Sequence, residues 1–166
     1  MTDSKPTITI EPVSSPDDLA AAKALFLAYA QSLDFSLCFQ GFDKELAEMP
    51  GKYDPAQNGA LLLGKVDGVA RGVVGLRDLG ANEKGDRMAE MKRLYVDPEG
   101  RGHNLGRLLA DAVIAEARRL GYRLMRLDTL RRMVAANRIY DALEFRDIPP
   151  YYDNPMDDVR YRELKL

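Results

Sequence analysis

A glycine-rich loop carries the clearest chemical signal in this chain. It runs from Arg101 to Gly106 (RGHNLG), follows the turn Asp97–Gly100 (DPEG) and leads into an apolar-periodic segment. Where a loop enters a helix, the first backbone N–H groups have no partner within the helix, and the helix dipole adds partial positive charge. Arg101 adds a full positive charge. We therefore expect this loop to bind a phosphate or pyrophosphate; the alternative is an ordinary glycine-rich connection with a solvated arginine.

The residues on either side of the loop predict the elements that position it. Lys92–Val96 has the β-branched and aromatic content of a strand end. After the loop, apolar residues recur on one side of a helical wheel, and Gly121 suits a C-terminal helix cap. The apolar side consists of Leu105, Leu109, Ala112, Val113 and Leu120, and the opposite side carries Arg107, Asp111 and Arg118.

Two further side chains could do chemistry. Cys38 suggests a covalent acyl-enzyme, but a lone cysteine with no histidine partner in the sequence is more typical of a small buried hydrophobe. His103 either contacts a phosphate in the loop or lies on the surface. One histidine and one cysteine argue against a His/Cys metal site, so we predict no metal.

Composition narrows the classes of function. A chain of 166 residues predicts a single domain over residues 1–166, with 24 basic and 26 acidic residues and a net charge of −2. This balance gives no electrostatic footprint for nucleic acid, and no apolar run is long enough to span a membrane. The polar N-terminus has no signal-peptide pattern, and a single cysteine suits a reducing compartment, so we expect a cytoplasmic protein.

The patterns along the chain predict alternating strands and helices. Ser15 and Pro16 form a helix start, and Asp67-Gly68 is a strong hairpin turn. A helix separates the strands Lys92–Val96 and Arg123–Thr129, so these two should be parallel. The predicted strands are Thr7–Ile10, Ala60–Val66, Val69–Leu76, Arg87–Val96, Arg123–Thr129 and Asp158–Leu166, and the later helices are Phe42–Met49, Leu105–Leu120 and Met133–Leu143.

The loop resembles motif A of the GNAT superfamily of acyl-CoA N-acyltransferases, Arg/Gln-x-x-Gly-x-Gly/Ala. Arg101 and Gly106 match its first and last positions, and Gly102 matches a frequent second one. The middle glycine of the motif is Asn104 here. Because Asn tolerates left-handed backbone geometry better than other non-glycine residues, the turn can persist.

A second stretch extends the resemblance over nearly the whole chain. Leu127–Thr129 (LDT) matches the fifth strand of many members, and Ala136 with Tyr140–Phe145 resembles the signature Asn-x-x-Ala-x-x-x-Tyr-x-x-Leu-Gly-Phe. Met133 and Glu144 depart from the signature, at its Asn and Gly. The resemblance implies a mixed α/β fold of order β-α-α-β-β-β-α-β-α-β-β with splayed parallel central strands.

The resemblance also implies a co-substrate, acetyl-CoA, and the residues that hold it. Its pyrophosphate would lie on the amides of the loop, and its pantetheine arm would bond main-chain groups near Leu94 and Val96, one of which could polarise the thioester carbonyl. The residues expected to bind coenzyme A are Leu94, Tyr95, Val96, Arg101, Gly102, His103, Asn104, Leu105, Gly106, Arg107, Met133 and Tyr140.

Two residues are candidates for proton transfer. Tyr140 matches the tyrosine that faces the CoA sulfur in the family and would be the general acid; alternatively it is a core tyrosine. Glu90 lies where many members carry a catalytic glutamate and would be the base, acting through water; alternatively it is a surface glutamate paired with Lys92 or Arg93. The segments Phe35–Phe42 and Tyr151–Asn154 border the acceptor site in similar members.

The leading hypothesis is therefore an acetyl-CoA-dependent N-acetyltransferase acting on a primary amine of a small molecule or protein, by direct attack in a ternary complex. A second hypothesis is a non-catalytic module of the same fold that binds acyl-CoA as a sensor or assembly partner. A third, a nucleotide-binding protein, lacks the expected Gly-Lys-Ser/Thr or Gly-x-Gly-x-x-Gly motif. Analogy with the family suggests a homodimer.

Overall fold

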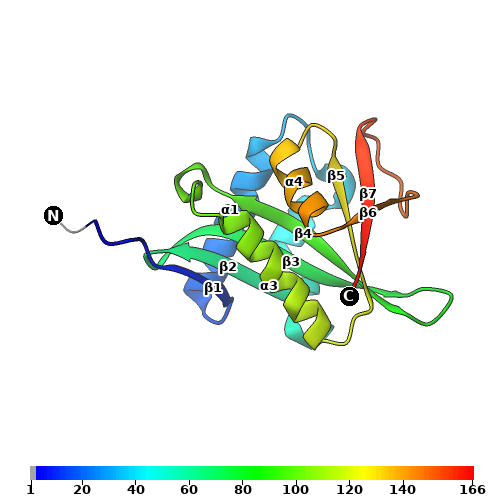
Figure 1. Cartoon of the computed structure of the whole chain (residues 1–166), viewed down its shortest axis with the longest axis horizontal. Coiled ribbons are helices and arrows are strands. Elements are labelled where there is room, and N and C mark those ends of the chain that lie inside the picture. Colours follow the sequence, from blue (N-terminus) through cyan, green and yellow to red (C-terminus); the bar gives the residue numbers. More distant parts are fainter. Residues whose placement is uncertain (1–2) are drawn as a thin grey trace.

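In a computed structural model of the protein, which describes residues 3–166, the chain forms a seven-stranded mixed sheet with α-helices on both faces (Figure 1). Met1 and Thr2 of the polar N-terminus lie outside the described residues. The strand order in the sheet is β1-β2-β3-β4-β5-β7-β6. The elements are β1 Ile8–Pro12, α1 Pro16–Ser32, α2 Phe42–Glu48, β2 Ala60–Val66, β3 Val69–Ala81, β4 Arg87–Val96, α3 Leu105–Arg119, β5 Leu124–Leu130, α4 Val134–Ala142, β6 Arg146–Ile148 and β7 Val159–Lys165.

The element order confirms the fold expected from the resemblance. The strand β6 was expected from the element order alone, without bounds. The bounds of β2 and β4 are those predicted, and the other helices and strands with predicted bounds begin and end within two residues of them except at one place. That exception is β3, which continues to Ala81 because Leu76–Ala81 pairs with the first half of β4. The Asp67-Gly68 turn has positive φ at both residues (49° and 80°), as a type I′ hairpin requires.

The central strands β4 and β5 are parallel, as predicted, but their pairing is short. Within residues 3–166 the register runs from Met88 with Leu124 to Glu90 with Arg126, after which the two strands separate. Arg93 has a left-handed φ of 59°, and the pairing of β3 with β4 shifts at this point, which marks a β-bulge. The bulge bends the second half of β4 away from β5 and leaves an edge of each strand open at the splay.

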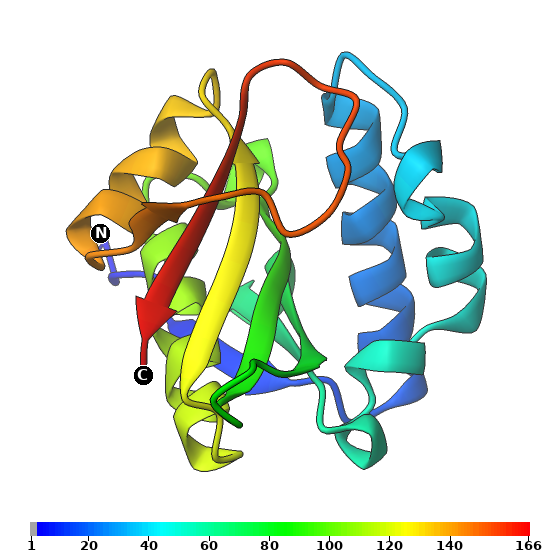
Figure 2. The same ribbon diagram turned by 90° about the vertical axis from the view of Figure 1, so that its right-hand side faces the viewer.

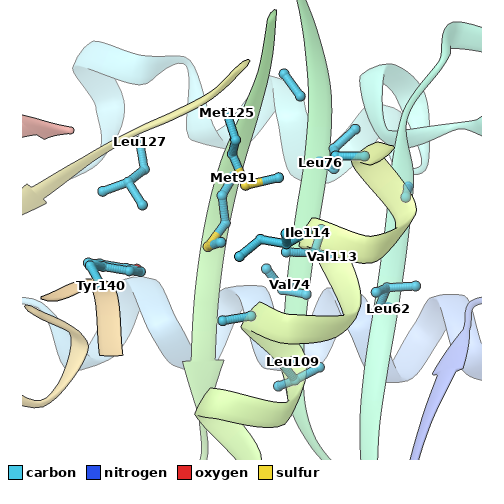
Figure 3. Packing of buried hydrophobic residues seen from close by; sticks show 14 of the residues in the cluster. Leu62, Val74, Leu76, Met91, Leu109, Val113, Ile114, Met125, Leu127 and Tyr140 are labelled. Atoms are coloured by element: carbon cyan, nitrogen blue, oxygen red, sulfur yellow. The ribbon is translucent and has the colours of Figure 1, made fainter. Parts of the chain in front are cut away.

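Side chains alternate between the two faces of the sheet, and each face has its own core. Toward α3 and α4 lie residues such as Leu62, Val74 and Met91, which pack against Leu109 and Val113 of α3 (Figure 3). Toward α1 the neighbouring positions of the same strands form a second cluster. Its fully buried members are Ala22, Phe26, Tyr53, Leu63 and Val73.

Two segments outside the regular elements border the splay. One is the connection from α1 to α2, where Cys38–Gln40 forms a 3₁₀ turn. The other joins β6 to β7, and Figure 2 shows it in orange-red, arching toward helix α1. Cys38 is exposed, so the expectation that it is a buried hydrophobe is wrong, because the turn directs this residue to solvent. No helix within residues 3–166 is long and apolar enough to cross a membrane.

Candidate active site

The loop after β4 is built by local hydrogen bonds and by residues with positive φ. Asp97 Oδ1 accepts a hydrogen bond of 2.9 Å from the Gly100 amide and closes a 3₁₀ turn over Pro98–Gly100. Gly102 has a φ of 85°, and Asn104, directly before α3, lies in the left-handed region with φ 58° and ψ 25°. This is the geometry that the sequence predicted Asn104 to tolerate. No side chain caps the start of α3 within the described chain, so its first amides point outward.

Gly106 lets two helices meet at this loop. A Cβ atom added at Gly106 would lie 3.1 Å from Cδ1 of Ile139 on α4, tighter than ordinary van der Waals contact. A larger side chain would therefore push α4 away from the N-terminus of α3. The glycine of the motif brings α4 close to the loop, so both helices border the same cleft.

A cleft of about 820 Å³ runs along this loop and the open half of β4. Ten of the twelve residues expected to bind coenzyme A line it; His103 and Tyr140 do not. The end of α1 and further residues of α4 complete its walls; α1 was not expected here, and of the α4 region only Met133 and Tyr140 were. The lining residues are Tyr29, Ser32, Leu33, Asp34, Phe35, Leu94, Tyr95, Val96, Gly100, Arg101, Gly102, Asn104, Leu105, Gly106, Arg107, Arg132, Met133, Val134, Ala135, Ala136 and Ile139.

Three arginines surround the mouth of the cleft, and they differ in their partners. Arg107 bonds Asp111 on the next turn of α3 at 3.1 Å, and Arg132 bonds Asp34 at 2.9 Å. Arg101 is exposed and forms no ion pair with another residue of the described chain. The uncompensated charge of Arg101 therefore lies beside the outward-pointing amides of α3, as an anion site requires.

Tyr140 lies behind the cleft, within the core. Its ring packs edge-on against Phe145, with 5.7 Å between the centroids, and faces Leu127 across the core (Figure 3). Burial raises the pKa of the Tyr140 hydroxyl, and the charge of Asp128 adds to the increase, so the hydroxyl keeps its proton at neutral pH. The hydroxyl forms no hydrogen bond within residues 3–166. Tyr140 can therefore be a core residue through its ring and still have a hydroxyl that is free to act as a general acid.

Glu90 lies in a buried network of charges rather than on the surface. It is 1% exposed, and its Oε1 accepts from Arg77 Nε at 2.7 Å while Lys92 Nζ lies 3.7 Å away. The Tyr151 hydroxyl donates to its Oε2 at 2.6 Å. Burial alone would raise the pKa of Glu90, but the charges of Lys92 and Arg77 and the hydrogen bonds outweigh it and lower the pKa. The expectation of a surface glutamate is wrong, although pairing with Lys92 is found; Arg93 instead bonds Glu45 at 3.0 Å.

A second, smaller pocket of about 50 Å³ lies within the splay, and we call it the inner pocket. It shares Tyr29, Phe35 and Met133 with the cleft, so the two spaces adjoin. The lining residues are Tyr29, Phe35, Leu37, Phe39, Gln40, Met91, Lys92, Arg93, Asp128, Thr129, Leu130, Met133 and Asn154.

Gln40 joins the segments around the inner pocket. Its Oε1 accepts from Arg93 Nη1 at 2.7 Å and from Lys92 Nζ at 3.3 Å, and its Nε2 donates to the Tyr152 hydroxyl at 3.0 Å. The Tyr152 hydroxyl in turn donates to Asp128 Oδ2 at 2.7 Å. Both segments that the resemblance placed beside an acceptor site thus meet at this pocket.

Comparison with known proteins identifies the family. The Acetyltransferase (GNAT) family matches residues 27–145, which include the loop, the splay and every residue that lines the cleft. The chain belongs to this family. An uncharacterized N-acetyltransferase of Schizosaccharomyces pombe is 40% identical over 159 residues, which is 96% of this chain and 95% of the relative. This member of the GNAT family therefore matches that relative over nearly all of the residues of both chains.

Solved structures share the fold at lower identity. An acetyltransferase from Streptococcus agalactiae has a TM-score of 0.75 at 20% identity, over 96% of this chain and 98% of the other. The YncA protein of Salmonella typhimurium, solved with its cofactor acetyl-CoA, has a TM-score of 0.71 at 22% identity, over 95% and 93% of the two chains. These likenesses support the fold and place an acetyl-CoA-binding protein among the structural neighbours.

The sequence analysis missed the polar contacts that line the splay. Gln40 entered the predicted site only as a member of Phe35–Phe42, and Lys92 only as an alternative partner of Glu90. Arg77 took no part in it, and Asp128 entered it as a strand match alone. Each of these residues gains its role from a partner distant in the sequence, so the local pattern gave no signal. A polar residue within an otherwise buried strand, such as Lys92 in Met88–Arg93, is the one available sign. Within residues 3–166, no group of three or more His, Cys, Asp or Glu side chains is arranged to hold a metal ion.

Proposed function

We propose that the protein is an N-acetyltransferase that transfers an acetyl group from acetyl-CoA to a primary amine by direct attack in a ternary complex. The observation that carries the proposal is the cleft, which has an anion site at one end and an open strand edge along its side. Family membership supports an acyltransferase, and the geometry supports the parts described below.

The loop supplies a site for the pyrophosphate of coenzyme A. The amides at the start of α3 point outward because Asn104 and Gly102 turn the chain with positive φ. Arg101 adds a charge without a protein partner, and hydrogen bonds to a charged group are stronger than neutral ones. The residues present therefore fit a diphosphate.

The open half of β4 supplies a site for the pantetheine arm. Because β5 separates from β4 after Glu90, the main-chain groups of Leu94–Val96 on that edge are available to an extended ligand. When bound, acetyl-CoA supplies the activated acetyl thioester. In this proposal, an N–H group of β4 near the bulge polarises its carbonyl oxygen, as in an oxyanion hole.

Tyr140 is the candidate proton donor to the departing thiolate. Its hydroxyl stays protonated at neutral pH and is not engaged by other side chains of the described chain. Glu90 remains a candidate base, but both of its oxygens already accept hydrogen bonds. Proton removal by Glu90 would therefore have to pass through Tyr151 or through water.

Thermal-shift titration with acetyl-CoA, CoA and ATP tests the binding part of the proposal. A ligand that binds the folded state raises the melting temperature, so both CoA species should stabilise the protein while ATP should not. Arg101→Ala should weaken binding about tenfold or more, the value of one hydrogen bond to a charged group. The control is Arg118→Ala, which removes the same charge from the exposed far end of α3.

Release of the CoA thiol in the presence of primary amines tests the catalytic part. Release that depends on both acetyl-CoA and an amine supports the enzyme. Stabilisation by acetyl-CoA without thiol release from any amine would instead support the non-catalytic acyl-CoA-binding module. No stabilisation by either CoA species would contradict both.

A further inference from the structure

The two buried acids beside the inner pocket are both held by basic side chains. Four ionised side chains beside the pocket are at most 9% exposed: Glu45, Glu90, Lys92 and Arg93. Arg93 pairs with Glu45 at 3.0 Å, and Lys92 lies 3.7 Å from Glu90. Lys52 also lies 2.6 Å from Glu45, and Arg77 lies 2.7 Å from Glu90, so each of these two acids is shared by two bases. Neither acid is therefore free to meet a ligand.

Asp128 is the acidic side chain among the residues that line the inner pocket. It lies on β5 two residues beyond the last residue paired with β4, is partly buried and lines the inner pocket. One carboxylate oxygen accepts from the Tyr152 hydroxyl at 2.7 Å. Within residues 3–166 no Lys or Arg lies within ion-pair distance of Asp128, and its second oxygen has no hydrogen-bond donor. The second oxygen of Asp128 is therefore open to a ligand, and its charge acts on Lys92, which lines the same pocket.

Three aromatic side chains also line the pocket. Tyr29, Phe35 and Phe39 line it, and two of them also line the cleft. Aromatic faces attract a cation through the negative charge of the ring face, and a carboxylate attracts it directly. A carboxylate with a free oxygen and three aromatic rings in one pocket is a suitable environment for an organic ammonium ion.

We propose that Asp128 binds the ammonium group of the acceptor and removes its proton, and that the acceptor presents this amine on an unbranched methylene. The inference rests on the proposed acetyltransferase function and adds the acceptor class. The narrow volume of about 50 Å³ favours a CH₂–NH₃⁺ end over an amine on a branched carbon. The shared boundary with the cleft brings the nitrogen toward the acetyl group.

The proton and electron balance of the step is simple. An ammonium proton passes to the Asp128 carboxylate, and the nitrogen lone pair then forms the C–N bond to the thioester carbonyl. As the C–S bond breaks, the sulfur takes its electron pair and a proton from Tyr140, and the nitrogen loses its second proton. Tyr140 is reprotonated by that second proton, and Asp128 releases the first to solvent, so one proton leaves for each acetyl group transferred.

Groups from every surrounding element face Asp128, and most of them stay neutral at working pH. Burial is the main cause that raises the pKa of the tyrosines. Burial also lowers the pKa of Lys92, although the charge of Glu90 by itself would raise that pKa. The groups that respond to the Asp128 charge are Tyr29, Lys92, Tyr140, Tyr151, Tyr152 and Tyr161.

Steady-state kinetics with simple amines tests the proposal. The probes are n-propylamine, isopropylamine, 2-aminoethanol, 1,5-diaminopentane and L-alanine, each with acetyl-CoA. We expect kcat/KM to be higher for n-propylamine than for isopropylamine. Asp128→Asn, which keeps an oxygen to accept from Tyr152, should lower kcat/KM for the amine by about a hundredfold or more, a typical value for a lost general base. The KM for acetyl-CoA should not change.

The dependence of kcat/KM on pH should change if Asp128 takes the proton of the amine, and should not change if Asp128 has only a structural role. In wild type, kcat/KM for n-propylamine should level off well below the pKa of the amine, about 10. In Asp128→Asn it should continue to rise up to that pKa, because no carboxylate then takes the proton. Tyr152→Phe removes the hydrogen bond to the Asp128 carboxylate but keeps the charge of that carboxylate. It should lower kcat/KM for the amine less than Asp128→Asn does. Asp157→Asn, an exposed acid of the same loop, is the matched control and should behave as wild type.

The possible outcomes separate the two proposals. If wild type acetylates an amine and Asp128→Asn stays within threefold of it with the same pH profile, the role of Asp128 is overturned and the acetyltransferase stands. Equal rates with n-propylamine and isopropylamine would overturn the acceptor class. If wild type binds acetyl-CoA but acetylates none of these amines, the proposed function itself fails, and the role of Asp128 with it. If Asp128→Asn does not melt cooperatively, Asp128→Glu and Asp128→Ala are compared instead. Asp128→Glu keeps the charge and should retain acetyl transfer to the amine, whereas Asp128→Ala should lose it.

Discussion

Asn58 and Asn104 adopt the same left-handed backbone conformation in different parts of the molecule, with φ 58° and ψ 27° at the first and φ 58° and ψ 25° at the second. Asn58 ends a 3₁₀ turn before β2, while Asn104 precedes α3 at the cleft. This equivalence provides a matched pair for separating backbone strain from ligand binding.

Replacing each asparagine with alanine should destabilise the protein by a similar amount. An L-residue with a Cβ pays about 1–2 kcal/mol in this conformation, and alanine lacks the local hydrogen bonds with which asparagine offsets part of the cost. Chemical denaturation should therefore show a loss of about 1 kcal/mol or less in each variant. Acetyl-CoA binding, measured by calorimetry, should weaken in Asn104→Ala alone, because relaxation of this turn redirects the amides of α3.

Asn104→Gly should keep the turn and retain the affinity of wild type, because glycine adopts positive φ without a steric penalty. Equal loss of acetyl-CoA affinity in Asn58→Ala and Asn104→Ala would mean that the loop conformation does not determine binding.

Tyr140→Phe should separate catalysis from folding. Because the hydroxyl makes no hydrogen bond to another described residue, its removal should change the melting temperature little, while the ring keeps its packing against Phe145. Loss of a general acid should lower kcat by about a hundredfold or more. The KM for acetyl-CoA, measured in the same thiol-release assay, should stay close to that of wild type.

Tyr122→Phe is the control for removing a buried hydroxyl elsewhere. The Tyr122 hydroxyl donates to the backbone oxygen of Asn58 at 2.7 Å, away from the cleft. This variant should lose stability without a change in kcat, the opposite of Tyr140→Phe. An undiminished kcat in Tyr140→Phe would leave Tyr140 as a core residue.

Glu90→Gln should destabilise the protein at neutral pH. It leaves Arg77 and Lys92 without their shared carboxylate, and breaking a buried ion pair typically costs about 3–5 kcal/mol. The measurement is chemical denaturation at several pH values. Glu116→Gln removes a carboxylate that pairs with an exposed arginine on α3, and should cost about 1 kcal/mol or less.

The pH dependence follows from the lowered pKa of Glu90. As the pH falls below the ordinary value of 4.5, the unfolded chain takes up a proton at this residue before the folded protein does. Glu90 therefore stabilises the fold above that pH, and the stabilisation is lost as the pH falls toward the lowered value. Wild type should lose stability more steeply than Glu90→Gln in this range.

The same variant tests Glu90 as the base. If Glu90 takes the proton of the amine, Glu90→Gln should lower kcat most strongly below the pKa of the amine. An unchanged pH–rate profile in Glu90→Gln, together with an altered one in Asp128→Asn, would assign proton removal to Asp128.

The sequence predicted those parts of the structure that depend on neighbouring residues. The alternation of Ala60–Val66, the Asp67-Gly68 turn and the apolar side of α3 are local patterns, and the structure follows them. The extension of β3 to Ala81 was missed because Gly80 and the polar residues near it resemble a loop, whereas pairing with β4 holds them in a strand.

In the candidate site, too, the parts built from neighbouring residues were predicted and the parts built from distant residues were not. The loop Arg101–Gly106 was predicted because its chemistry lies in consecutive residues. The network through Gln40 was not, because its partners Lys92 and Tyr152 lie 52 and 112 residues away. The burial of Glu90 likewise depends on Tyr151 and Arg77, which reach it from other strands and loops.

The division of the site between segments has a consequence for how such proteins diversify. The cleft is built mainly from the second half of β4, the start of α3 and α4. These elements belong to the frame formed by the sheet and its helices. The inner pocket depends on two connections, one after α1 and one between β6 and β7, that pack on this frame. Insertions or exchanges in these two loops could therefore produce enzymes with new amine preferences from an unaltered donor site, and loop chimaeras between paralogues offer a direct way to redesign them.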